Sequence, residues 1–265
     1  MLFNSLRFLI SFVLLSFPRF AVGDTTLPTG GVICERGAFP EVYISGGVTE
    51  IISPPLLDSS TAARRKAVTV SEFCISQNEI SAGIFQACVQ DGYCSPLRGS
   101  QGNPDYPVHS ITYDEVNQFL LWLQKSKNIE YRLPTEAEWQ FAALGGREDR
   151  FPWRVVGRLP NVNIFSGEID PVGKNSMNEF GVRDAVGNLS EFVSGCFTPD
   201  IDRIPENGLP FEAENCGYRL TKGGHYASPD FFLSPYFRAP IPADFGSPQI
   251  GLRLVRSINS ENWND

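Results

Sequence analysis

The clearest hydrophobic periodicity in the chain lies between residues 112 and 127. Four apolar side chains recur there at helical spacing and would share one face: Val116, Phe119, Leu120 and Leu123. Thr112 and Asp114 stand just before this run, and both residue types cap helix N-termini. The pattern predicts an amphipathic helix whose apolar stripe faces a core.

Two shorter segments also have helical spacing. Residues 79–90 place four side chains on one face, with Ser81 as an alternative cap one or two residues into the segment: Ile80, Ile84, Ala87 and Cys88. Residues 135–146 begin with Thr-x-x-Glu, the capping-box pattern, and end with two glycines that would stop a helix. We therefore expect helices in both segments.

Strand patterns are shorter and more scattered. The stretch VTVSEFCI (68–75) predicts one strand, and EVYISGGVTEII (41–52) contains short β-type runs. From Arg147 to the end only short strands between turns are expected, which agrees with the 24 glycines and 20 prolines. No repeat or linker divides the chain, so we expect a single domain with two main helices and a largely irregular β-rich remainder.

The N-terminus has the order of a secretory signal peptide. Arg7 precedes the apolar run 8–17, and the small residues Ala21-Val22-Gly23 follow. We expect a signal peptide at 1–23 and one domain at 24–265, in the periplasm or secreted. The alternative is an N-terminal membrane anchor, although the run is too short to span a bilayer comfortably. No other segment could span a membrane, so no stable span is expected after cleavage.

Composition limits the partners. The chain has a formal net charge of −8 and no basic stripe, so its surface would repel nucleic-acid phosphates. Apolar residues make up 42%, enough to bury a substantial core. We expect no nucleic-acid partner.

The six cysteines indicate disulfides formed in an oxidising compartment. Sequence alone allows about fifteen pairings of six cysteines. Short loops favour Cys88–Cys94 and Cys196–Cys216, which leaves Cys34–Cys74. A metal site is the rival interpretation, but no CxxC or histidine-rich spacing supports it.

The run YRLPTEAEWQFAALGG (131–146) resembles the formylglycine-generating enzyme, or sulfatase-modifying factor, family. Six further blocks match that family in order, among them DYPVHSITYDEVNQFLLWL (105–123), VNIFSGE (162–168), NEFGVRDAVGNLSEFV (178–193), KGGHY (222–226) and IGLRLV (250–255). The resemblance covers about residues 40–256. It implies an α+β, C-type-lectin-like fold with short mixed strands and long ordered loops.

The resemblance also implies that one activity is lost. The family's oxidases hold copper with two cysteines soon after the RGGS motif. Here the segment reads KGGHYASPDFFLSPYFRAP (222–240), and Ser228 and Leu233 occupy the two cysteine positions. A serine hydroxyl is a poor ligand for copper(I), and leucine is none. We therefore expect no copper and a pseudoenzyme with respect to that oxidation.

Iron is the metal of other relatives, which hold it with histidines of a separate domain. This chain has two histidines, His109 and His225. A site with two histidines and one carboxylate would require both to converge on an acid. His109 is expected to be packed or on the surface, whereas His225 replaces the family serine at the rim of the former active site.

The resemblance places calcium at the loop DAVGNLSEF (184–192). Carried over by position, the ligands would be the carbonyls of Asp184, Gly187 and Leu189 and the carboxylate of Glu191. The alternative is a loop closed by hydrogen bonds alone, with Asn188 bonding the backbone. A second calcium would use Asn163 and Ile164, with Asp170 as a substitute acid, but the shortened loop puts that site in doubt.

Ser190 stands where the family has a tryptophan that lines the substrate channel. The loss of this residue and of the cysteine pair suggests a rebuilt groove. We expect five residues there to contact a partner: His225, Tyr226, Ser228, Asp230 and Phe232. The predicted function is non-catalytic binding of another exported or periplasmic protein, with an immunity protein or inhibitor of a periplasmic toxin as one version.

Two catalytic alternatives remain open at this point. One is a periplasmic accessory enzyme of natural-product (siderophore) maturation, for which His225, Tyr226 and Arg238 are the residues to test. The other is a remodelled oxidase of the same family that uses different ligands.

Overall fold

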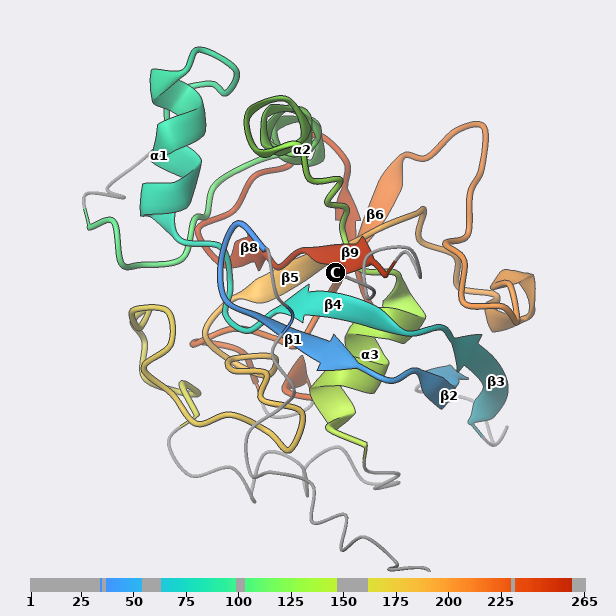
Figure 1. Cartoon of the computed structure of the whole chain (residues 1–265). Helices are drawn as coiled ribbons and strands as arrows, with labels where there is room; N and C mark the ends of the chain where they lie inside the picture. The colour runs from blue at the N-terminus through green and yellow to red at the C-terminus, as the bar shows by residue number, and fades with distance from the viewer. Residues whose placement is uncertain are drawn as a thin grey trace, which may run out of the picture.

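The computed structural model describes residues 34, 37–53, 63–98, 103–146, 162–229 and 232–258. Within these ranges three α-helices accompany nine short strands and one 3-10 turn, η1 (Ile201–Arg203). Figure 1 shows strands crossing the middle of the molecule, with α1 and α2 together at one end. The chain therefore has the mixed α+β architecture that its family resemblance implied. The predicted signal peptide lies outside the described residues.

The three helices begin where their caps predict. The longest, α2 (Tyr113–Lys127), has a capping box formed by Thr112 and Glu115. The other two are α1 (Ala82–Gln90), which Ser81 caps, and α3 (Glu136–Leu144), which Thr135 and Glu138 cap and which ends at Gly145. These side chains satisfy backbone N–H groups that the first helical turn leaves unpaired. Helix α1 confirms the shorter helix expected over residues 79–90, with Ser81 as its cap.

The strands form three small sheets. One is antiparallel, in the order β1-β4-β9: β1 (Glu41–Ile44), β4 (Phe73–Ser76) and β9 (Val255–Ser257). Another pairs β2 (Gly47–Ser53) with β3 (Arg64–Val70). The third has the order β7-β6-β5-β8, with β5 and β8 parallel: β5 (Ser190–Val193), β6 (Tyr218–Lys222), β7 (Ala239–Pro242) and β8 (Ile250–Leu252).

The single strand predicted over 68–75 is wrong, because β3 ends at Val70 and β4 begins at Phe73. Ile44 of β1 pairs with Phe73 of β4, and Gly47 of β2 pairs with Val70 of β3. The two facing segments, 41–53 and 64–76, therefore bend at the same level and pass together from the first sheet into the second. Gly46 makes this bend possible at φ +73°, since a Cβ there would lie 2.5 Å from the carbonyl oxygen of Val70. Residue alternation alone does not show such a bend.

Two apolar clusters fill the interior. One surrounds α3, which packs against β2, β3 and β6 and buries Trp139. The other joins α1, α2 and β8 and includes Phe119 and Phe192. Neighbouring residues of β5 point into different clusters, Phe192 into the second and Val193 into the first. Strand β5 thus lies between the two halves of the core.

All three disulfides are the expected ones, Cys34–Cys74, Cys88–Cys94 and Cys196–Cys216. The first ties residue 34 to β4, and the third closes the long connection between β5 and β6. Among the described residues, no helix is both long and apolar enough to cross a bilayer.

Candidate functional site

The site is built around a buried ion pair between Glu191 of β5 and Arg253, which follows β8. The Arg253 guanidinium donates from Nη2 to Oε1 and from Nε to Oε2, each over 2.8 Å. Trp139 of α3 donates its indole N–H to the same Oε2 over 2.6 Å. Such two-point pairing fixes the orientation of both side chains.

Arg253 also holds the backbone of two other segments. Its Nη1 donates to the carbonyl oxygens of Ser76 and Gln77, at 2.9 and 3.1 Å, just after β4. Its Nη2 donates to the carbonyl oxygen of Arg183 over 2.6 Å. One guanidinium therefore positions the strand ends and the loop that precedes β5.

This arrangement bears on the calcium predicted at residues 184–191. Glu191 was expected to be the charged ligand, yet both of its carboxylate oxygens accept hydrogen bonds from Arg253 and Trp139. The donor set therefore does not fit calcium at this position unless Arg253 moves away. The carbonyls of Asp184, Gly187 and Leu189 remain in the same loop, but they carry no charge.

Asn188 closes the loop by the hydrogen bonds that the alternative interpretation described. Its backbone adopts φ +48°, and its Oδ1 accepts from Asn163 Nδ2 and from the backbone N–H of Asp170, each at 2.9 Å. Its Nδ2 donates to Glu79 Oε2 over 2.6 Å. The side chain is fully buried, which leaves no room for a glycan at the Asn-Leu-Ser sequence.

Glu79 is a central residue that the sequence analysis did not identify. It is buried, and its Oε1 accepts the backbone N–H of Leu189 at 3.0 Å. Burial raises the pKa of Glu79 well above its usual range, and the nearby carboxylates of Asp184 and Glu191 raise it further. The positive charge of Arg253 and the hydrogen bond from Asn188 lower this pKa, but by less. A single acidic residue at the start of a predicted helix gives no sequence signal of this role, because acids are common there.

Two buried oxygens near this network have no partner among the described residues. Asp184 accepts from Asn175 on Oδ1 at 2.7 Å, while its Oδ2 accepts nothing. Burial raises the pKa of the Asp184 carboxyl. Asn163 donates from Nδ2, while its Oδ1 accepts nothing. An unpaired buried acceptor is costly, so both oxygens suit a water, a proton or a cation.

The second predicted calcium site is only partly assembled. Asn163 and Ile164 lie beside Gly187, as expected for one loop packed on the other. Asp170 instead pairs its carboxylate with Lys174. Of the three expected residues, Asn163 is the one whose ligand atom is buried and unpartnered.

The loop after β6 is anchored against the same centre. The backbone N–H of Tyr226 donates to the carbonyl oxygen of Asn188 over 2.9 Å. Gly223 at φ +91° passes so close to the backbone that a Cβ would lie 2.6 Å from the carbonyl oxygen of Ala185. This close approach is the physical reason for glycine in the KGGHY motif.

His225 is half-buried at the start of this loop. Its backbone N–H donates to Ser228 Oγ over 2.9 Å, and its Nδ1 accepts the N–H of Ala227 over 3.3 Å. Burial lowers the pKa of His225, so at neutral pH the ring is uncharged, with its proton on Nε2. The edge of this ring meets Tyr226 at a centroid separation of 5.6 Å.

The five residues expected to contact a partner have different positions. His225, Tyr226 and Phe232 are half-buried, and Phe232 packs edge-on against Phe237. Ser228 is only 2% exposed, so its hydroxyl supports the turn instead of lying at the surface. Leu233 is 3% exposed. Asp230 lies outside the described residues.

A second buried ion network adjoins the loop. Arg238 binds Glu136 of α3 at two points, 2.6 and 3.0 Å, and the Lys222 Nζ lies 3.4 Å from the same carboxylate. Burial lowers the pKa of Lys222 to about 8, although Glu136 acts in the opposite direction. Arg238 is thus committed to a structural ion pair.

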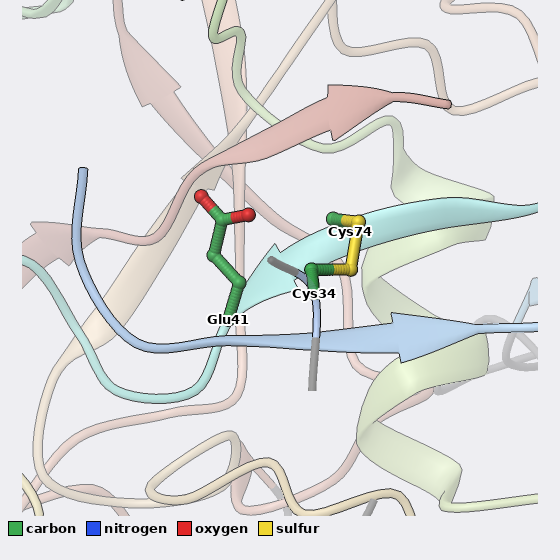
Figure 2. Close-up of side chains that lie close together, drawn as sticks. All are labelled: Cys34, Glu41 and Cys74. Carbon is green, nitrogen blue, oxygen red and sulfur yellow. A yellow bond between two sulfur atoms is a disulfide. The ribbon is translucent and has the colours of Figure 1, made fainter. Parts of the chain in front are cut away.

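The metal-ligating side chains of the described chain form one three-membered cluster, Cys34, Glu41 and Cys74 (Figure 2). The two sulfurs are joined as a disulfide. Glu41 accepts from the Tyr131 hydroxyl and from Arg256 Nε, the latter at 2.7 Å. These groups are therefore already paired with one another. The two histidines share no metal-ligating cluster within the described ranges.

Comparison with known proteins gives a consistent result. A family model described as "Sulfatase-modifying factor enzyme 1-like domain" matches residues 35–258. A formylglycine-generating enzyme of Streptomyces coelicolor is 28% identical over 178 residues, which cover 60% of this chain and 55% of that enzyme. The chain therefore spans about half the length of this relative.

Two further relatives match over most of their length. The chaperone protein LppX of Paenibacillus barcinonensis is 24% identical over 291 residues, covering 89% of this chain and 92% of that protein. The structure of PvdO from Pseudomonas aeruginosa matches with a TM-score of 0.73 and 22% identity, covering 86% of this chain and 99% of PvdO. This similarity confirms the predicted fold.

We predict that Glu191→Gln destabilises the protein by about 3–5 kcal/mol, because it leaves Arg253 buried without a counter-charge. Urea unfolding measures the change. The double variant Glu191→Gln, Arg253→Met should recover part of the loss, since it removes the uncompensated charge. A loss below about 1 kcal/mol in the single variant would contradict the central role of this pair.

Lys222 should give the protein a distinct alkaline pH dependence. Its folded pKa of about 8 lies below the usual 10.5, so the unfolded state binds more protons between these values. The contribution of Lys222 to stability should therefore rise with pH across this window, on the order of 1 kcal/mol per pH unit. Subtracting the unfolding free energies of a Lys222→Met variant from those of the wild type isolates this slope. A flat difference would refute it.

Proposed function

This chain belongs to the sulfatase-modifying factor enzyme 1-like family, and we propose that it is a non-catalytic member that binds another exported protein through the loop after β6. The observation that carries the proposal is the state of the two former cysteine positions. Ser228 and Leu233 are both buried, and neither offers a soft ligand for copper(I). The loop thus keeps its place in the fold without the groups that perform the oxidation.

The part of the loop at residues 223–228 is suited to recognition because hydrogen bonds hold its backbone before any partner binds. Tyr226 is bonded to the carbonyl of Asn188, and Ser228 closes the turn on His225. His225, Tyr226 and Phe232 keep part of their surface open. A preorganised loop loses less entropy on binding than a mobile one.

The match to LppX supports the same proposal. It extends over about nine-tenths of both chains, and that relative is named a chaperone protein. A chaperone acts by binding another protein. A partner in the periplasm or outside the cell agrees with the three disulfides. An immunity protein or an inhibitor of a periplasmic toxin is one version of this function.

An accessory enzyme of natural-product (siderophore) maturation is the second candidate. His225 favours it, since an uncharged imidazole stands half-exposed at the rim of the family's active site. Arg238 counts against it, because its guanidinium is bound to Glu136 at two points. A binding role is therefore consistent with both residues, whereas a catalytic role would leave Arg238 unused.

The deciding experiment has two parts. The purified protein should yield no aldehyde from a sulfatase-type cysteine peptide, with or without copper. In a pull-down from periplasmic extract, Tyr226→Ala and Phe232→Ala should reduce recovery of the captured protein. Tyr93→Ala is the matched control, because Tyr93 is 45% exposed after α1, elsewhere on the chain.

Either of two results would overturn the proposal. Aldehyde above the no-enzyme level would mean that other ligands replace the cysteines. Equal capture by folded loop variants and wild type would place the binding surface elsewhere. Thermal melts of each variant separate loss of binding from loss of fold.

We further propose that any calcium binds at Asn163 and not at Glu191. The amide oxygen of Asn163 is buried and unpartnered, and with the carbonyl of Ile164 it would supply oxygen ligands of the kind calcium prefers. Bound calcium would hold residues 162–170 against the Asn188 loop.

A chelator should then lower the melting temperature of the wild type, because a ligand stabilises the state that binds it. Asn163→Ala should remove this sensitivity, whereas Ser166→Ala, on the exposed part of the same loop, should keep it. Chelator sensitivity that persists in Asn163→Ala would reject the assignment. So would a wild type that does not respond to the chelator.

A further inference from the structure

Exposed aromatic and proline residues lie at one end of the β6–β7 pair. Tyr218 begins β6 and is 56% exposed, and Pro242, the last residue of β7, lies directly opposite it. Phe245 is 50% exposed, and its N–H donates to the carbonyl oxygen of Pro242 over 3.1 Å. We name Tyr218, Pro242 and Phe245 the β6–β7 platform.

Two acidic residues lie close to the platform residues in the sequence. Asp244 precedes Phe245, and Glu214 stands two residues before Cys216, which a disulfide joins to Cys196 just after β5. Both carboxylates are exposed, and in the described part of the chain neither has an ion-pair partner. The platform therefore combines open aromatic faces with negative charge that the protein itself does not neutralise.

The edge of the sheet limits how a partner could attach here. Strand β7 is the outer strand of its sheet, and both Pro240 and Pro242 lack a backbone N–H. A partner strand could not extend the ladder regularly along such an edge. Recognition at this end must therefore use side chains.

We propose that the β6–β7 platform binds an arginine-bearing, cationic segment of a partner protein. A guanidinium can stack on an aromatic ring while it donates to a carboxylate, and arginine does both better than lysine. The same strand already shows this stacking, since the Arg219 guanidinium lies 3.9 Å from the ring centroid of Tyr113. The net charge of −8 would favour approach of a cationic segment.

A labelled nona-arginine peptide tests the platform, with nona-lysine as its matched probe. Fluorescence anisotropy with the full chain should show tighter binding of the arginine peptide. The double variant Tyr218→Ala, Phe245→Ala should weaken it by about fivefold or more, as expected for the loss of two stacking contacts. Glu214→Lys with Asp244→Lys should weaken both peptides.

Two controls keep the result specific. Tyr93→Ala removes an exposed aromatic residue elsewhere, and Tyr226→Ala alters the loop of the proposed function, so neither should change arginine-peptide binding. Equal affinity for the two peptides, with binding lost between about 50 and 500 mM salt, would show only attraction to an acidic protein and reject the platform. Unchanged binding in the folded platform double variant would reject it as well. Neither of these results would bear on the proposed function, because the pull-down with the Tyr226→Ala and Phe232→Ala variants tests that function separately.

Discussion

The buried pair of Arg253 and Glu191 is the interaction on which the rest of the structure depends. Arg253 reaches the end of β4, the loop at Arg183 and the carboxylate of Glu191, and Glu191 in turn accepts the indole N–H of Trp139 from α3. A buried charge must be paired and hydrogen-bonded, so each of these segments has a fixed position relative to the others. The short sheets have few ladder bonds of their own, and this shared centre compensates for that.

A second polar layer extends this centre toward the surface. Glu79 holds Asn188 and the backbone of Leu189, and Asn188 holds Asn163 and Asp170. The carbonyl of Asn188 then receives the N–H of Tyr226. The first part of the loop after β6, residues 223–228, is therefore connected to the core through one continuous hydrogen-bond network. Such a loop can change its outward side chains without loss of the fold.

Absence of the family's second cysteine pair and retention of its scaffold are thus compatible in physical terms. Ser228 and Leu233 fill their positions as buried, supporting side chains, and Arg238 is tied to Glu136. Neither residue offers a soft ligand for copper(I), and both are packed inside the fold. His225 and Tyr226 beside the former site, and Tyr218 and Phe245 at the end of β6, are the partly open side chains on which binding would depend.

The sequence by itself determined the local features. Thr135 with Glu138 specified the start of α3, because a capping box acts within one turn. Close cysteine pairs specified two disulfides, and the third followed. The family blocks indicated the fold. The tertiary structure decided what depends on residues far apart in the chain. Arg253 meets Glu191 from 62 positions away, and Glu79 meets Leu189 across 110. The bend that separates β3 from β4 depends on Gly46 of the facing arm. Burial of Ser228 and pairing of Glu191 are likewise properties of the packed molecule, since residue type does not reveal which charges will share an interior.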